Sequence, residues 1–357
     1  MNLHRFGIVI AGIALSASIF VQAADLKQLP THTGGRVLVS NSAAGEQVYE
    51  YSWPSIYFET AFKGDSLTLK FDDDQNNFQL IVDSGVPILI KKPGKQDYVV
   101  PGLTEGKHHV RLEKISETQS SSGRFLGFFS DDKPLKLKAK DRQIEFIGDS
   151  YTVGYGNISP SRECNNKQLF EATNSQLAFG PLVAKHFNAD YQINASSGFG
   201  VVRNYDGHSP DKSLIGLYPF TLYSNNYIYN SDWQPQVIVI GLGTNDFSTK
   251  LGYRERWKTR AELQQDYVNK YVEFVKSLQR KNSTAQFVLM ASTNAENEIA
   301  NQVTKVLEQL KASGMKNIDS IIFSGLDFQG CHWHPSAKDD KLLSELLIKH
   351  LQSKKVW

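Results

Sequence analysis

The sequence predicts two domains: an N-terminal all-β sandwich of jelly-roll type, and a C-terminal three-layer α/β domain with a five-stranded parallel sheet. The chain has 357 residues, which is long for one domain and natural for two. From about residue 25 to 140, short strands alternate with turns. From about 141, apolar runs alternate with amphipathic helical segments. We therefore expect domains over 24–140 and 141–357.

The first 23 residues predict a secretory signal peptide. Arg5 precedes an apolar run over 6–20, and Val21-Gln22-Ala23 offers a small-residue cleavage site. A membrane anchor is the alternative, although the run is short for a bilayer span. We expect cleavage after Ala23, a secreted or periplasmic protein, and no attachment to the membrane.

The N-terminal half shows runs that alternate partly with period two and are separated by glycine-containing turns such as Gly64-Asp65 and Pro93-Gly94. Many short strands at this spacing are typical of a sandwich or a jelly roll. Helical periodicity is nearly absent. The clearest strand candidates are residues 36–40, 66–71, 78–83, 98–100 and 108–113.

The C-terminal half contains five strand candidates, most of them nearly uninterrupted apolar runs, as buried parallel strands should be. Helical segments with one apolar face lie between them, and Ser336 with Asp339 forms a capping-box-like start for the last one. The strand candidates are 144–148, 191–195, 237–241, 287–291 and 320–323, and the helix candidates are 261–281, 297–314 and 336–351.

The net charge bears on whether the protein binds nucleic acid or membranes. There are 39 Lys and Arg against 37 Asp and Glu, a net charge of +2, and loss of Arg5 with the leader lowers this by one. A surface so close to neutral gives no reason to expect nucleic acid or anionic lipid as a partner.

No spacing of metal ligands is evident, so we expect no metal and no cofactor. We expect a monomer.

Gly148-Asp149-Ser150 directly follows the first apolar run of the α/β half. A strand that ends in a small residue, an acid and a serine delivers a hydroxyl to the carboxyl end of a sheet, where ligands bind in open α/β folds. A serine hydroxyl needs a base to become a nucleophile. Taken alone, the tripeptide is equally well explained as a turn or a helix cap.

Three further residues supply the other parts of a hydrolase. His334, followed by Pro335 ahead of the last helix, has the side chain best suited to act as a base near neutral pH. The Asn245 amide and the Gly198 N–H, which both follow predicted strands, can donate to a developing oxyanion. Each residue alone is as well explained by an ordinary turn or surface loop, but the four together in this order indicate catalysis.

The order Ser150, Gly198, Asn245, His334 resembles the SGNH (GDSL-type) hydrolases over roughly residues 141 to 357. The segments around Ser197-Gly198-Phe199-Gly200 and Cys331-His332-Trp333-His334-Pro335 are similar to carbohydrate esterase family 2. That family carries an N-terminal jelly roll, and its members remove acetyl groups from xylan and glucomannan, often at the sugar 6-position. We therefore expect a serine esterase that acts on an acetylated polysaccharide or oligosaccharide.

The resemblance implies Ser150 as nucleophile and His334 as base, with the Ser150 N–H, the Gly198 N–H and the Asn245 side chain as the oxyanion hole. Many SGNH enzymes place an Asp three residues before the histidine, and some members of family 2 place one two residues before it; this chain has Cys331 and His332 there. A backbone carbonyl or an acid from elsewhere must then orient His334, and we favour the carbonyl. Asp149 is expected to brace the turn.

Other residues beside the motif are candidates for substrate contact or for a covalent link. Trp333 could stack on a sugar ring or pack against the sandwich, Tyr151 could form a site wall, and Arg203 could form another wall or a structural ion pair. Cys164 and Cys331 are the only two cysteines. In an exported protein a disulfide is the default, with two buried thiols as the alternative.

Three competing functions stay open at this point. One is a non-catalytic sugar-binding protein, against which the retention of the whole motif argues. The second is a secreted lipase on the same fold, which should have an apolar channel for acyl chains. The third is a peptidoglycan O-deacetylase, for which export would be equally suitable.

Overall fold

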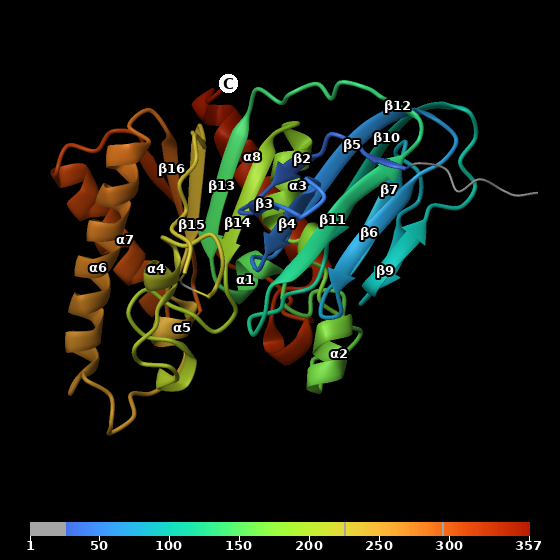
Figure 1. Cartoon of the computed structure of the whole chain (residues 1–357). Coiled ribbons are helices and arrows are strands. Elements are labelled where there is room, and N and C mark those ends of the chain that lie inside the picture. Colours follow the sequence, from blue (N-terminus) through green and yellow to red (C-terminus); the bar gives the residue numbers. More distant parts are fainter. Residues whose placement is uncertain (1–25, 225, 295) are drawn as a thin grey trace, which may run out of the picture.

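The computed structural model describes residues 26–224, 226–294 and 296–357, so the predicted signal peptide lies outside the described part. Figure 1 shows a β-sandwich lying beside a parallel sheet that is covered by helices. The predicted fold class is confirmed. Among the described residues, no helix combines the length and apolarity that crossing a membrane requires.

The N-terminal half is built from two six-stranded antiparallel sheets, with orders β3-β4-β11-β6-β9 and β12-β5-β10-β7-β8; β1 pairs with β11, and β2 pairs with β5. The strands are β1 Lys27–Gln28, β2 His32–Gly34, β3 Leu38–Asn41, β4 Gln47–Tyr51, β5 Tyr57–Gly64, β6 Thr68–Asp73, β7 Asn77–Val82, β8 Ile88–Lys91, β9 Gly94–Val99, β10 Gly106–Lys114, β11 Gly123–Ser130 and β12 Lys133–Pro134.

The strand order is that of a jelly roll. From β4 to β7, each strand lies in the sheet opposite to its predecessor, and β8 to β11 return along the same path, so that β10 lies between β5 and β7 and β11 lies between β4 and β6. Two interlocked Greek keys of this kind bury one face of each sheet. The core between them is rich in aromatic rings and includes Tyr49, Tyr51, Phe58, Phe62, Phe71, Phe78, Phe125 and Phe128.

The C-terminal half contains one parallel sheet in the order β14-β13-β15-β16-β17. The order reverses between β13 and β15, and such a reversal opens a crevice at the carboxyl ends of the strands. The strands lie within a residue or two of the predicted runs: β13 Gln143–Gly148, β14 Asp190–Ala195, β15 Val237–Gly241, β16 Gln286–Ser292 and β17 Ile318–Phe323.

Helices cover both faces of this sheet. α6 and α7 pack together on one face, and α3 and α8 pack together on the other. Ser336 and Asp339 form the predicted capping box at the start of α8. The helices are α1 Ser150–Val153, α2 Asn166–Glu171, α3 Phe179–His186, α4 Leu214–Leu217, α5 Thr244–Phe247, α6 Arg260–Lys281, α7 Glu298–Ala312 and α8 Ala337–Lys354, with single turns η1 Ser175–Leu177, η2 Tyr205–Gly207 and η3 Cys331–Trp333.

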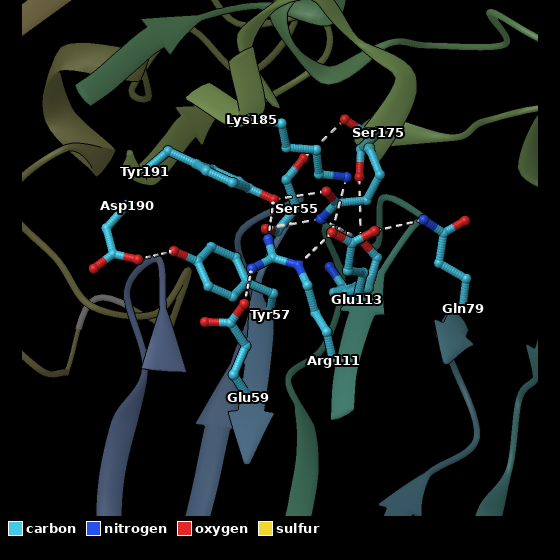
Figure 2. A network of polar contacts seen from close by, with 12 residues as sticks. Ser55, Tyr57, Glu59, Gln79, Arg111, Glu113, Ser175, Lys185, Asp190 and Tyr191 are labelled. Carbon is cyan, nitrogen blue, oxygen red and sulfur yellow. Dashed lines mark hydrogen bonds and ion pairs between the residues drawn. The ribbon is translucent and has the colours of Figure 1, made fainter. Parts of the chain in front are cut away.

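A buried polar network joins the sandwich to the β14 edge of the parallel sheet (Figure 2). Arg111 on β10 donates to Glu59 at 2.5 Å, to Glu113 at 2.6 Å and to the Tyr191 hydroxyl at 2.9 Å. Lys185 of α3 lies 2.8 Å from Glu113. Removing one partner from such a buried set costs ~3–5 kcal/mol because it leaves an unpaired charge. The network therefore ties the two halves to each other.

Candidate active site

Ser150 is placed by the turn between β13 and α1. Asp149 is the N-cap of α1, and its Oδ1 atom accepts a hydrogen bond from the Tyr151 N–H at 3.0 Å. A Cβ atom at Gly148 would lie 1.9 Å from Thr152 Oγ1, so only glycine fits before the cap. Burial raises the pKa of Asp149 to about 7. Asp149 thus serves the turn, as expected from the sequence.

The Oγ atom of Ser150 lies 2.9 Å from Nε2 of His334. The Nδ1 atom of the same imidazole lies 3.0 Å from the carbonyl oxygen of Cys331 and 3.2 Å from that of His332. Carbonyl oxygens only accept, so Nδ1 carries the hydrogen and Nε2 presents its lone pair to the serine hydroxyl. Burial lowers the pKa of His334 to about 4, which keeps the ring neutral.

The loop that carries His334 is held at several points. A disulfide joins Cys331 to Cys164, 167 residues apart in sequence, which is the pairing expected from the sequence. His332 adds a second link, because its Nε2 lies 2.8 Å from the Cys164 carbonyl oxygen and its Nδ1 lies 3.0 Å from the Tyr155 hydroxyl. The disulfide and these contacts fix the backbone whose carbonyls orient the imidazole.

The two expected oxyanion residues beyond Ser150 lie at the same end of the sheet. Gly198 has a φ of +83°, a conformation that glycine adopts without strain. Asn245 is buried on α5, and its Nδ2 donates to the Phe199 carbonyl at 2.9 Å. A primary amide carries a second N–H, which remains for a ligand. Ser150, Gly198, Asn245 and His334 all line one cleft.

This cleft has a volume of about 780 Å³, and both halves of the chain form its walls. Such a volume is within the usual range for small-ligand sites. The sandwich contributes the segment from Glu117 to Ser120 as well as Gln75 and Lys92. These sandwich residues carried no signal in the sequence, because polar side chains in loops are ordinary.

The three residues suggested as substrate contacts have different outcomes. Trp333 and Tyr151 line the cleft, and Trp333 is 57% exposed, with Arg162 5.7 Å from its ring centroid. Arg203 as a site wall is wrong. Its guanidinium is buried and bound to Glu255, at 2.5 and 2.9 Å, and to the Thr249 hydroxyl at 2.8 Å, so it is a structural ion-pair partner.

Tyr155 is a site residue that the sequence reasoning missed. Its ring centroid lies 4.2 Å from that of His334, with the planes tilted by 35°. The tyrosine therefore covers one face of the imidazole and contributes to its burial. Its position five residues after Ser150 is the only sequence signal, and that spacing is not specific.

One side-chain cluster in the described residues has the spacing of a metal site. The ligand atoms of His32, Glu59 and Asp190 lie within 4.8 Å of one another. Lys140 Nζ lies 3.4 Å from Asp190 and 3.8 Å from Glu59, and Arg111 binds Glu59 as well. These cations already neutralise the carboxylates, so the cluster belongs to the network between the two halves.

Comparison with known proteins places the chain in a family. Residues 33–138 match the family described as Carbohydrate esterase 2 N-terminal, and residues 144–347 match the family GDSL-like Lipase/Acylhydrolase. The acetylxylan esterase / glucomannan deacetylase of Cellvibrio japonicus (strain Ueda107) is 62% identical over 361 residues, covering 100% of each chain. This chain belongs to carbohydrate esterase family 2. It is a carboxylic ester hydrolase, and the resemblance inferred from its motifs is confirmed.

Solved structures of family members share the whole fold. One is a carbohydrate esterase whose active site displays divergent catalytic and non-catalytic binding functions; it is 63% identical, with a TM-score of 0.89, over 93% of this chain and 100% of that chain. Another, a family two carbohydrate esterase from Clostridium thermocellum in complex with cellohexaose, is 28% identical, with a TM-score of 0.79, over 92% of this chain and 100% of that chain.

Proposed function

We propose that this carbohydrate esterase is a serine esterase that removes O-acetyl groups from polysaccharides of the xylan and glucomannan type, including acetyl groups at the sugar 6-position. The observation that carries the proposal is the contact of 2.9 Å between Ser150 Oγ and His334 Nε2, which lies in a cleft whose walls come from both halves of the chain. The deacetylase activity named for the relative that is 62% identical supports the same substrate class.

In the first half of the reaction, Ser150 Oγ attacks the acetyl carbonyl carbon while His334 Nε2 takes the hydroxyl proton. The carbonyl oxygen becomes an oxyanion, which the N–H groups of Ser150 and Gly198 and the Asn245 amide stabilise. The intermediate collapses with cleavage of the bond to the sugar oxygen. His334 then returns its proton to that oxygen, and the deacetylated sugar leaves.

In the second half, water replaces the sugar. His334 Nε2 accepts a proton from this water, whose oxygen attacks the carbonyl carbon of acetyl-Ser150. The same oxyanion donors act again, and the proton returns to Ser150 Oγ as acetate departs. The imidazolium formed in each half is stabilised by the carbonyls of Cys331 and His332, so the proposed machinery is a Ser–His dyad that works without a carboxylate partner.

The lining of the cleft combines polar and aromatic side chains, a mixture that suits a sugar. Polar side chains such as Gln75, Lys92 and Gln119 face the same space as Trp333 and Tyr155. Hydroxyl-rich substrates need hydrogen-bonding partners, and aromatic faces suit the apolar side of a sugar ring.

We infer further that the protein acts outside the cytoplasm, secreted or periplasmic, as a monomer. The predicted leader and the disulfide between Cys164 and Cys331 support export, since disulfides persist in oxidising compartments. The polysaccharide substrate, which does not enter cells, is consistent with this location.

Acetate release tests the proposal. Wild type and Ser150→Ala are compared on acetylated xylan, acetylated glucomannan, acetylated peptidoglycan and a long-chain ester. We expect wild type, and not the variant, to deacetylate the plant polysaccharides. Equal release by both would remove Ser150 from the mechanism. Sugar binding without acetate release would indicate a binding protein, and turnover confined to the long-chain ester or to peptidoglycan would replace the proposed substrate.

A further inference from the structure

The segment of the sandwich between β10 and β11 contacts the loop that carries Gly198. Gln119 Nε2 lies 2.8 Å from the Ser197 carbonyl oxygen and 3.0 Å from Ser196 Oγ. Glu117 Oε1 accepts the Ser197 N–H at 2.8 Å and also the Gln119 amide at 3.0 Å. Both side chains line the cleft. The sandwich thus forms hydrogen bonds with two successive peptide groups of the hydrolase half, one on each side of Ser197.

One of these peptide groups carries the proposed oxyanion donor. The Ser197 carbonyl and the Gly198 N–H belong to the same planar peptide, in which oxygen and hydrogen point in opposite directions. A donor held on the Ser197 oxygen therefore fixes the direction of the Gly198 N–H. It also polarises that N–H, because hydrogen bonds in a chain strengthen one another.

The hydrolase half holds the rest of this loop, mostly through the residues that follow Gly198. Residues after Gly198 are held by the hydrolase half itself, since Asp246 accepts the N–H groups of Val201, Val202 and Arg203 at 2.9 to 3.0 Å. Asn245 binds the Phe199 carbonyl at 2.9 Å. Gly198 itself has a φ of +83°, and its carbonyl accepts the Tyr205 N–H at 2.9 Å. Glu117 and Gln119 restrain the loop on the other side of this glycine.

We propose that Gln119, supported by Glu117, is a positioning residue for catalysis: the sandwich domain aims the Gly198 N–H at the oxyanion. This proposal rests on the proposed function, because it assumes that the Gly198 N–H stabilises the intermediate of a serine esterase. The jelly roll is then part of the catalytic machinery as well as a wall of the cleft. Neither side chain touches the reacting atoms in this role.

A donor-to-acceptor exchange at residue 119 tests the proposal. Gln119→Glu keeps the shape but sets a carboxylate against the Ser197 carbonyl, whereas Gln119→Met removes the donor without adding charge. Gln96→Glu on β9, which lies outside the cleft and is exposed, makes the same charge change in the same domain as a matched control. Initial rates are measured on nitrophenyl acetate, which has no sugar, and on an acetylated oligosaccharide.

We expect Gln119→Met to lower kcat by about 10-fold and Gln119→Glu by about 100-fold, approaching the loss of an oxyanion donor. The fall should be equal on both substrates, with KM within about twofold, because positioning acts on the transition state. Glu117→Gln keeps an acceptor for the Ser197 N–H and should retain more activity than Glu117→Ala. Gln96→Glu should behave as wild type, and the unfolding temperatures should show that every variant folds.

Two results would overturn the inference alone. The first is an unchanged kcat for Gln119→Glu beside an inactive Ser150→Ala variant. The second is a change confined to KM for the oligosaccharide, which would make residues 117–120 a sugar-binding segment. By contrast, a wild-type chain without esterase activity, or a Ser150→Ala variant that keeps it, would overturn the proposed function and the inference with it.

Discussion

The Nδ1 atom of His334 lies 3.0 Å from the backbone carbonyl oxygen of Cys331, and the side chain of Cys331 is bound to Cys164. One residue therefore both orients the proposed base and anchors its loop to the segment that follows Ser150. The carbonyls of Cys331 and His332 occupy the place beside Nδ1 that an aspartate takes in many related enzymes. This arrangement has consequences for pH dependence and for stability.

The pH profile should reflect an unusually acidic imidazole. Burial lowers the pKa of His334 to about 4, and no carboxylate contact in the described residues opposes this. The base must be neutral to accept the Ser150 proton, so kcat/KM for nitrophenyl acetate should stay level from neutral pH to about 5 and fall about tenfold per pH unit below 4. Jump assays from acid back to neutral pH control for unfolding. A midpoint near the ordinary histidine value of about 6.5 would contradict this prediction.

Removing the Asn245 amide should slow the chemistry and leave binding intact. Asn245→Ala removes one proposed oxyanion donor, so kcat should fall by about 10²–10³ with little change in KM. Part of the loss in kcat comes from the loop beside Gly198, because the Phe199 carbonyl loses the hydrogen bond of 2.9 Å that the Asn245 amide donates. Steady-state kinetics on nitrophenyl acetate measure both constants. A kcat within threefold of wild type would exclude Asn245 from the oxyanion hole.

Trp333 should matter for polysaccharide and not for a small ester. Its side chain is 57% exposed in the cleft wall, which agrees with stacking on a sugar and not with packing against the sandwich. In Trp333→Ala, KM for an acetylated oligosaccharide should rise roughly tenfold, equivalent to about 1.4 kcal/mol. Tyr253→Ala, another exposed aromatic outside the cleft, is the control. An equal effect on nitrophenyl acetate would show that Trp333 acts on the dyad instead.

Loss of the disulfide should lower both stability and activity. The Cys164→Ser, Cys331→Ser double variant removes a link across 167 residues, and the free energy of unfolding should decrease by ~2–4 kcal/mol. The esterase activity at low denaturant concentration, where the variant is still folded, should fall as well. The reason is that the disulfide no longer holds the loop whose carbonyl at residue 331 orients His334. Urea unfolding followed by tryptophan fluorescence, together with kcat, checks both effects. A destabilised variant with unchanged kcat would show that the disulfide is not needed to orient His334.

Much of this site could be predicted because its residues follow strands. Ser150, Gly198 and Asn245 come after predicted strands, and the carboxyl ends of parallel strands meet at one edge. His334 was recognisable from its proline and the helix that follows. The period-two pattern likewise predicted the sandwich, although not its order, because pairing in a jelly roll joins strands that are far apart in sequence, such as β5 and β10.

Other parts were beyond the sequence for physical reasons. Arg203 follows the loop that carries Gly198, a position that favours a site wall, but its partner Glu255 lies 52 residues further along the chain. Glu117 and Gln119 act across the boundary between the two halves, and contacts of that kind have no periodicity. Tyr155 covers the imidazole because of the conformation of the loop that follows α1. The local sequence preferences do not determine that conformation.

The central test of the proposed reaction is to trap the acetyl-enzyme and locate its acetyl group, because this identifies the nucleophile. Wild type is mixed with nitrophenyl acetate, quenched with acid during the first turnovers, digested and analysed by mass spectrometry, with Ser150→Ala treated in parallel. We expect one acetyl group per chain, located on Ser150, that forms before steady state and is missing from the variant. An acetyl group on another residue, or continued turnover by Ser150→Ala, would contradict it.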